Sequence, residues 1–322
     1  MDLFLSCLVV SQLIESNQYI MQRLARDENF EITLHRCQDP KTNKLAITFG
    51  GQPSDLSSRG FGTDFLLSLG LDTIYVAQKF GTQYQGCSIN QFRDAILPLA
   101  GNWDDVICYG SSLGGYAALY YGGVVNARII AAAPMLPAWP PLKLPAYVDH
   151  PITHSELKDV PLSIHDPTVF YDPMVARDKF LVENMVEAAY PKFRAVPIPF
   201  VGHTVLVTLS QARLLRPIIE NLILNDALIA FEAPAEGTAI WHGERGCHLI
   251  KSDPIAAKVH LKKSLEIRPS RRIFSQLIQC LINLGQLEEA QAELDLAKES
   301  GDKNFTLFPP RAKKVIEAGL VA

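Results

Sequence analysis

Apolar positions along the chain fall into patterns that predict a sheet of buried strands. Residues 30–37 alternate apolar and polar side chains, which is typical of a strand with one exposed face. The strands after it are apolar throughout and are separated by helical stretches, as in a parallel sheet that is covered on both faces. We predict these strands at 44–49, 72–78, 104–109, 127–133, 167–171 and 195–200. The pattern therefore predicts an α/β protein with one antiparallel edge strand and six parallel strands.

The amino-terminal residues have helical rather than strand periodicity. Apolar side chains recur at Leu13, Ile14, Ile20 and Leu24, which predicts a helix within residues 1–28. This stretch lacks the basic region and the small-residue cleavage site of a signal peptide. No apolar run reaches the roughly 20 residues that a membrane-spanning helix needs, so we expect no membrane span. We expect the amino-terminal helix to pack on the domain or on a neighbouring subunit.

The composition changes beyond about residue 228. We interpret residues 229–252 as a linker and 253–322 as a helical extension. Within the extension, the small residue Ala257 is matched by Ala290, 33 residues later. This spacing looks like that of tetratricopeptide repeats, although fewer than the three or so repeats of a free-standing solenoid are present. The extension also carries a large apolar stripe, which includes Ile255, Leu261, Leu277 and Leu281. We therefore expect it to pack partly on the preceding domain and partly as a homodimer or protein-partner surface.

Charge and cysteine content narrow the class of protein. The 322 residues have a net charge of −4, which provides no electrostatic reason to expect nucleic acid as a partner. The six cysteines have no paired spacing, and Cys108 lies in a predicted buried strand. Reduced thiols, and hence a cytoplasmic protein, are the expectation. His242, Cys247 and His248 fit no common zinc spacing, so we expect no metal, and nothing in the sequence calls for a cofactor.

A Gly-x-Ser-x-Gly motif at 110–114 carries the first chemical information. It follows the apolar run 106–109 and precedes a stretch with small residues typical of a closely packed helix. A strand, this pentapeptide and a helix together form a nucleophile elbow, which exposes the central serine, Ser112, at the top of a sheet. At this motif the chain resembles the α/β-hydrolase superfamily. The resemblance implies a mostly parallel sheet flanked by helices, here within 29–228, and the chain order nucleophile, acid, histidine.

Two further residues complete a candidate triad in that order. His203 follows the last predicted strand and would act as the general base toward Ser112. Asp172 follows the strand at 167–171 and would orient the imidazole. Asp166 precedes that strand and would face the wrong end of the sheet, and Asp178 lies a helical turn or more further on. We favour Asp172 as the acid and leave the other two as alternatives.

The resemblance also implies an oxyanion hole and a lid. Its donors would be the backbone N–H of Leu113 and that of Gly51, with Gln52 as the second choice in the same loop. Tyr84 and Gln85 follow the second parallel strand and are candidate substrate contacts, although a polar surface loop is the commoner outcome. The proline-rich stretch 137–166 is interpreted as a short lid over the site, or else as a plain surface excursion.

The leading hypothesis is a serine hydrolase that cleaves a carboxylic ester through an acyl-enzyme on Ser112, acting on a small-molecule or acylated substrate. A thioesterase or an acyltransferase would use the same triad. The competing hypothesis from another class is a non-catalytic scaffold that binds a protein partner through its carboxyl-terminal helices.

Overall fold

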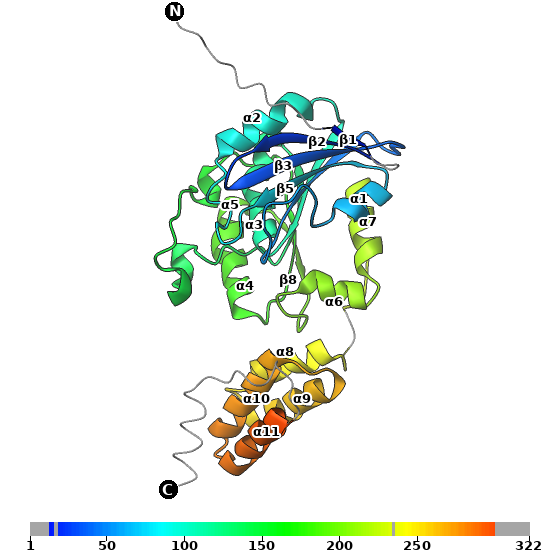
Figure 1. The fold of residues 1–322 in the computed structure, drawn as a ribbon. Helices are drawn as coiled ribbons and strands as arrows, with labels where there is room; N and C mark the ends of the chain where they lie inside the picture. Colours follow the sequence, from blue (N-terminus) through cyan, green and yellow to red (C-terminus); the bar gives the residue numbers. More distant parts are fainter. Residues whose placement is uncertain (1–12, 16–18, 234–235, 300–322) are drawn as a thin grey trace, which may run out of the picture.

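The computed structural model describes residues 13–15, 19–233 and 236–299, and its centre is one nine-stranded sheet (Figure 1). The strand order is β1-β2-β3-β5-β4-β6-β7-β8-β9. The strands from β5 to β9 along this order pair in parallel, whereas β1, β2 and β3 join them by antiparallel pairing. The parallel strands are β4 (Lys44–Phe49), β5 (Asp72–Gln78), β6 (Asp105–Ser111), β7 (Arg128–Ala132), β8 (Thr168–Tyr171) and β9 (Arg194–Pro197). The predicted mostly parallel sheet flanked by helices is confirmed.

The amino-terminal helix predicted within 1–28 is wrong where the structure describes it. β1 (Leu13–Glu15) and β2 (Tyr19–Arg26) are strands, and β2 pairs along β3 (Phe30–Cys37). Residues 27–29 fold β2 back onto β3 as an antiparallel hairpin, and this strand pairing overrides the helical pattern of the segment. Residues 1–12 and 16–18 of the prediction lie outside the described residues.

Helices cover both faces of the sheet, which explains why its strands are apolar throughout. On one face, Leu45 and Ile47 of β4 share a core with α2 (Ile89–Ala100) and α3 (Leu113–Gly122). On the opposite face, Ala46 of β4 shares a second core with α1 (Thr63–Ser68), α6 (Val205–Gln211) and α7 (Leu215–Asn225). Successive side chains of a strand point to opposite faces, so each strand needs apolar residues at every position.

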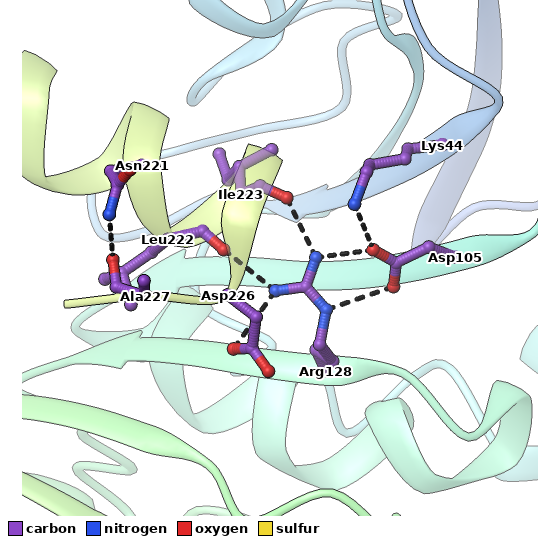
Figure 2. A network of polar contacts seen from close by, with 8 residues as sticks. All are labelled: Lys44, Asp105, Arg128, Asn221, Leu222, Ile223, Asp226 and Ala227. Atoms are coloured by element: carbon purple, nitrogen blue, oxygen red, sulfur yellow. Dashed lines mark hydrogen bonds and ion pairs between the residues drawn. The ribbon is translucent and has the colours of Figure 1, made fainter.

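Charged side chains close the amino end of the parallel sheet (Figure 2). Lys44, Asp105 and Arg128 are the first residues of three neighbouring strands, and Asp105 accepts from Lys44 Nζ at 2.7 Å and from Arg128 Nε at 3.1 Å. Arg128 also donates to the carbonyl oxygens of Leu222 and Ile223, each at 2.8 Å. These carbonyls belong to the last turn of α7, where helix carbonyls lack the usual backbone partners. Leu222 O also accepts from the backbone N–H of the C-cap residue Asp226 at 3.1 Å. The network therefore joins α7 to the strand starts.

The carboxyl-terminal extension consists of helices with a core of their own. They are α8 (Ala239–Leu249), α9 (Pro254–Ile267), α10 (Arg271–Asn283) and α11 (Leu287–Glu299). Because α8 occupies 239–249, the predicted linker 229–252 is wrong over that part. Of the predicted apolar stripe, Leu261, Leu277 and Leu281 are buried in this core, whereas Ile255 is exposed. The helices thus bury only part of the stripe among themselves, and the expected homodimer or partner surface stays a prediction. Likeness to tetratricopeptide repeats stays a prediction, and residues 300–322 lie outside the described part.

The extension contacts the sheet domain through α8, which lies below α6 and β8 in Figure 1. The ring of Phe200, which follows β9, lies 6.1 Å from that of Trp241 and 5.9 Å from that of His248, and the guanidinium of Arg245 lies 4.9 Å from its centre. Next to it, a β-carbon added at Gly202 would lie 2.8 Å from Glu244 Oε1. The extension therefore packs against the loop that leads to His203.

Candidate active site

Ser112 occupies a strained turn between β6 and α3. Its backbone angles are φ 55° and ψ −123°, a combination that costs energy for any residue with a β-carbon. A β-carbon at Gly110 would collide with the backbone of Gly114, and one at Gly114 would collide with the carbonyl oxygen of Phe49. The two motif glycines are therefore required for the turn to close. The turn holds the serine side chain at the carboxyl end of the sheet.

His203 lies against that serine. Its Nε2 is 2.8 Å from Ser112 Oγ, and its Nδ1 is 2.9 Å from Oδ1 and 3.1 Å from Oδ2 of Asp178. Because a carboxylate only accepts, Nδ1 carries the proton that it donates to Asp178, and Nε2 is left to accept from the serine hydroxyl. The Asp178 side chain is 1% exposed, whereas that of His203 is 34% exposed. The imidazole therefore has a buried anionic partner on one side and an open face on the other.

The assignment of Asp172 as the orienting acid is wrong by this geometry. Its Oδ1 accepts from the backbone N–H of Met174 at 2.8 Å and its Oδ2 from that of Gly202 at 2.7 Å. Burial raises the pKa of the Asp172 carboxyl, and the backbone N–H groups around it, Gly202 first, oppose that rise. Asp172 therefore positions the loop that bears His203 without touching the imidazole.

Helix α4 (Ala176–Leu181) explains why the later aspartate reaches the histidine. The chain leaves β8 at Asp172, turns through Pro173 and enters α4, whose first turn contains Asp178. The turn carries Asp178 back to the same edge of the sheet as Ser112 and His203. Asp166, the other alternative, precedes β8, and no contact between it and His203 is present among the described residues.

No protein-family model matches the chain, and no curated protein matches its sequence. Among solved structures, alpha/beta hydrolase domain-containing protein 10 from mouse is similar at 16% identity and a TM-score of 0.42, over 64% of this chain and 99% of its own. A dienelactone hydrolase from Anabaena variabilis is similar at 14% identity and a TM-score of 0.42, over 66% of this chain and 99% of its own. An esterase from Pyrobaculum calidifontis is similar at 15% identity and a TM-score of 0.41, over 62% of this chain and 82% of its own.

The observation that decides the fold lies within the chain itself. A mostly parallel sheet has a strained serine turn directly after its third parallel strand, and the histidine and the carboxylate follow later strands. The chain has the α/β-hydrolase fold. In an α/β-hydrolase the site lies at the carboxyl ends of the strands, where all three of these residues are found.

The predicted oxyanion-hole residues lie at the same edge. Leu113 is the first residue of α3, where the backbone N–H has no intrahelical acceptor. A β-carbon at Gly51 would lie 3.5 Å from the backbone oxygen of Ser111, so this loop runs directly beside the elbow. Gln52 lines the same cavity as Ser112. The placement of these residues is compatible with their predicted roles, which stay predictions.

Tyr84 and Gln85 do not lie in the cavity, and their prediction as substrate contacts is wrong. The Tyr84 hydroxyl is buried and donates at 3.0 Å to the carbonyl oxygens of Gly50 and Val76. The Gln85 Oε1 accepts from the backbone N–H groups of Thr153 and His154, each at 2.9 Å. Both side chains serve the scaffold, because residues 83–85 turn inward, whereas residues 79–81 directly after β5 are exposed.

The predicted lid, 137–166, is a chain of turns held on α3. It contains three short 3₁₀ turns and no α-helix. The His154 ring stacks at 4.0 Å on that of Tyr120, and the backbone N–H of Ala138 donates to Gln83 Oε1 at 2.8 Å. Pro137, Leu144 and Tyr147 of this stretch line the cavity. The segment is therefore a fixed wall of the site.

The cavity at Ser112 has a volume of about 790 Å³ and three walls. One comes from the sheet domain, one from residues 137–147, and one from the carboxyl-terminal helices, including Ile240, Ser264 and Ile273. The volume lies in the range of small-molecule sites. Sequence reasoning missed this third wall, because no local pattern in α8–α10 refers to a catalytic group.

The described residues contain neither a cluster that could hold a metal ion nor a helix that could span a membrane. No group of three or more His, Cys, Asp or Glu side chains is placed there to hold a metal ion. Within the same residues, every helix is too short or too polar to cross a bilayer.

Proposed function

We propose that this α/β-hydrolase is a serine hydrolase that cleaves a carboxylic ester through an acyl-enzyme. The observation that carries the proposal is the continuous pair of contacts from Ser112 Oγ to His203 Nε2 at 2.8 Å and from His203 Nδ1 to Asp178 at 2.9 Å. A serine hydroxyl is a weak nucleophile unless such a base removes its proton. The strained backbone at Ser112 supports the same role, because strain of this kind gathers at functional sites.

In the proposed reaction, Ser112 is the nucleophile, His203 transfers the protons and Asp178 orients His203. His203 takes the proton as Ser112 Oγ bonds to the ester carbonyl carbon, and the N–H groups of Leu113 and Gly51 stabilise the negative oxygen. The carbon–oxygen bond to the alcohol then breaks, and the alcohol leaves with the proton from His203. Water, deprotonated by His203, then bonds to the acyl carbon. The bond from that carbon to Ser112 Oγ breaks, His203 returns the proton to Oγ, and the acid leaves. Asp178 holds the imidazole in the productive tautomer and stabilises it when charged.

Two alternatives share parts of this proposal. A thioesterase or an acyltransferase would use the same three residues and differ in the group that leaves or receives the acyl chain. A non-catalytic scaffold would use the carboxyl-terminal helices to bind a protein and would leave Ser112 unreactive.

The free thiols of Cys37, Cys87, Cys108, Cys247 and Cys280 support a reducing compartment such as the cytoplasm.

Covalent labelling with a fluorophosphonate probe tests the proposal. We expect wild-type protein to be labelled and Ser112→Ala to be unlabelled, because the probe bonds only to an activated serine. Turnover of p-nitrophenyl esters of increasing chain length, with Ser112→Ala as the control, would then define the acyl group. Wild-type protein that is neither labelled nor active on any of these esters would favour the scaffold.

A further inference from the structure

Two arginines without partners line the cavity that contains Ser112. Arg177 lies in α4, directly before Asp178, and Arg268 follows the last residue of α9. Both residues are exposed. Within the described part of the chain, neither guanidinium has a hydrogen-bond or ion-pair partner. One belongs to the sheet domain and the other to the carboxyl-terminal extension.

The acidic side chains of the same lining are already engaged. Asp178 accepts from His203, and Glu244 forms an ion pair with Arg272. Burial raises the pKa of the Glu244 carboxyl, and the nearby Arg272 opposes that rise. No further Asp or Glu lines this cavity. The lining thus contains three arginines and two carboxylates, and no carboxylate of the described residues lies within ion-pair distance of Arg177 or Arg268.

We propose that the cavity binds esters that carry an anionic oxygen group, a carboxylate or a phosphate, through Arg177 and Arg268; this inference rests on the hydrolase function proposed above. A guanidinium binds carboxylate and phosphate with two parallel hydrogen bonds, and such charge-assisted bonds are about twice as strong as neutral ones. Apolar side chains of the same cavity, among them Met135, Leu144 and Ile273, leave room for the uncharged part of the ester. The extension would thus supply half of the anion-binding pair.

Binding to an inactive protein tests the anion site separately from catalysis. On a Ser112→Ala background, calorimetry would compare monomethyl glutarate with dimethyl glutarate, which differ by one charge and one methyl group. We expect the monoanion to bind about tenfold or more tightly than the diester, in line with a hydrogen bond to a charged group. Monomethyl phosphate in a third titration would distinguish a phosphate site from a carboxylate site.

Variants then assign the effect to the two arginines. Arg268→Gln and Arg177→Gln should each weaken monoanion binding by about tenfold and leave diester binding unchanged. Arg268→Lys should retain part of the affinity, because the charge stays while the paired hydrogen bonds are lost. Arg93→Gln, an exposed arginine of α2 outside the cavity, is the matched control and should change nothing. Thermal unfolding of each variant would show that it is folded.

Kinetics on active protein provide the second measurement. The p-nitrophenyl half-ester of glutaric acid should have a lower KM than its neutral methyl p-nitrophenyl diester, and Arg268→Gln should raise only the half-ester KM. Equal binding of mono- and diester by Ser112→Ala, or equal effects of Arg268→Gln on both, would overturn the proposal. Anion binding that depends on Arg268 in a protein that no fluorophosphonate labels would instead overturn the catalytic function and keep the anion site.

Discussion

The two ends of the parallel sheet differ in how their charged groups are satisfied. At the amino end, Asp105 accepts hydrogen bonds from Lys44 and Arg128, and Arg128 also pairs with Asp226 and two helix carbonyls (Figure 2). At the carboxyl end, Ser112 has strained backbone angles, and His203 keeps an open face toward the cavity.

The two ends of the sheet therefore have different roles: the amino end stabilises the fold, and the carboxyl end holds the candidate active site. The amino-end network links strand starts to α7 and leaves no charge of its own members unpaired, so it stabilises the fold. The carboxyl end stores strain and presents unpaired donors, which lowers stability and prepares a site for a ligand. We expect substitutions at the two ends to have opposite profiles, with activity lost at one and stability lost at the other.

The largest effect is expected for Ser112→Ala at the carboxyl end. Ester turnover should fall by roughly four to six orders of magnitude, because the nucleophile and its base act as a unit. The urea midpoint of unfolding should not decrease, since the substitution removes no packed group. A urea midpoint clearly below that of wild type would show that the carboxyl end also carries stability.

A smaller but still severe loss is expected for Asp178→Asn. The asparagine cannot hold the imidazole in the same tautomer, so kcat should fall by about 10⁴-fold. Asp172→Asn is the matched control, because Asp172 is the other buried aspartate of this edge and bonds only to the loop backbone. It should lower kcat by about ten- to a hundredfold through misplacement of His203. A reversed order of the two kcat values would restore Asp172 as the orienting acid.

At the amino end, Arg128→Met should lower stability and spare activity. It leaves Asp105 with Lys44 alone and removes both guanidinium donors to the last turn of α7, which should cost about 2–4 kcal/mol of unfolding free energy. Urea unfolding at 25 °C would measure this loss, and kcat of the folded fraction should stay near wild type. Arg216→Met, which breaks only an exposed helix pair with Glu220, should cost less than about 0.5 kcal/mol.

The smallest effect concerns how stability depends on pH. Hydrogen bonds from Arg128 and Lys44 outweigh burial and lower the pKa of Asp105, whereas burial raises the pKa of Asp172. Asp105 is therefore protonated more readily in the unfolded protein than in the folded one. The stability that its ionised carboxylate contributes is lost as pH falls below about 3.9. Asp172, in contrast, is protonated more readily in the folded protein than in the unfolded one. The free energy of unfolding should therefore decrease at this residue as pH rises above about 3.9.

Urea midpoints between pH 3 and pH 7 would detect both contributions. Asp105→Asn should flatten the acid-side loss, and Asp172→Asn should flatten the decline at higher pH. Identical pH profiles for wild type and both variants would contradict the contrast between the two ends of the sheet.

The sequence alone determined the features that rest on short-range physics. Residues apolar on both faces predicted the buried parallel strands, and the strand, the glycine-flanked serine and the following helix predicted the turn at Ser112. The position of His203 after the last strand followed from chain order. Each of these depends on neighbours within a few residues, or on a rule of chain order that holds across the fold.

Tertiary structure alone decided which residues come together across long separations. Asp172 and Asp178 both follow β8, and only the direction of α4 brings the second one to His203. Tyr84 resembles a surface residue in sequence, yet its hydroxyl is buried against β5. Arg268 is distant from Ser112 in sequence and lines the same cavity because α8 packs on the loop at Phe200. Pairing, burial and domain contact are set by the whole chain, so no local pattern encodes them.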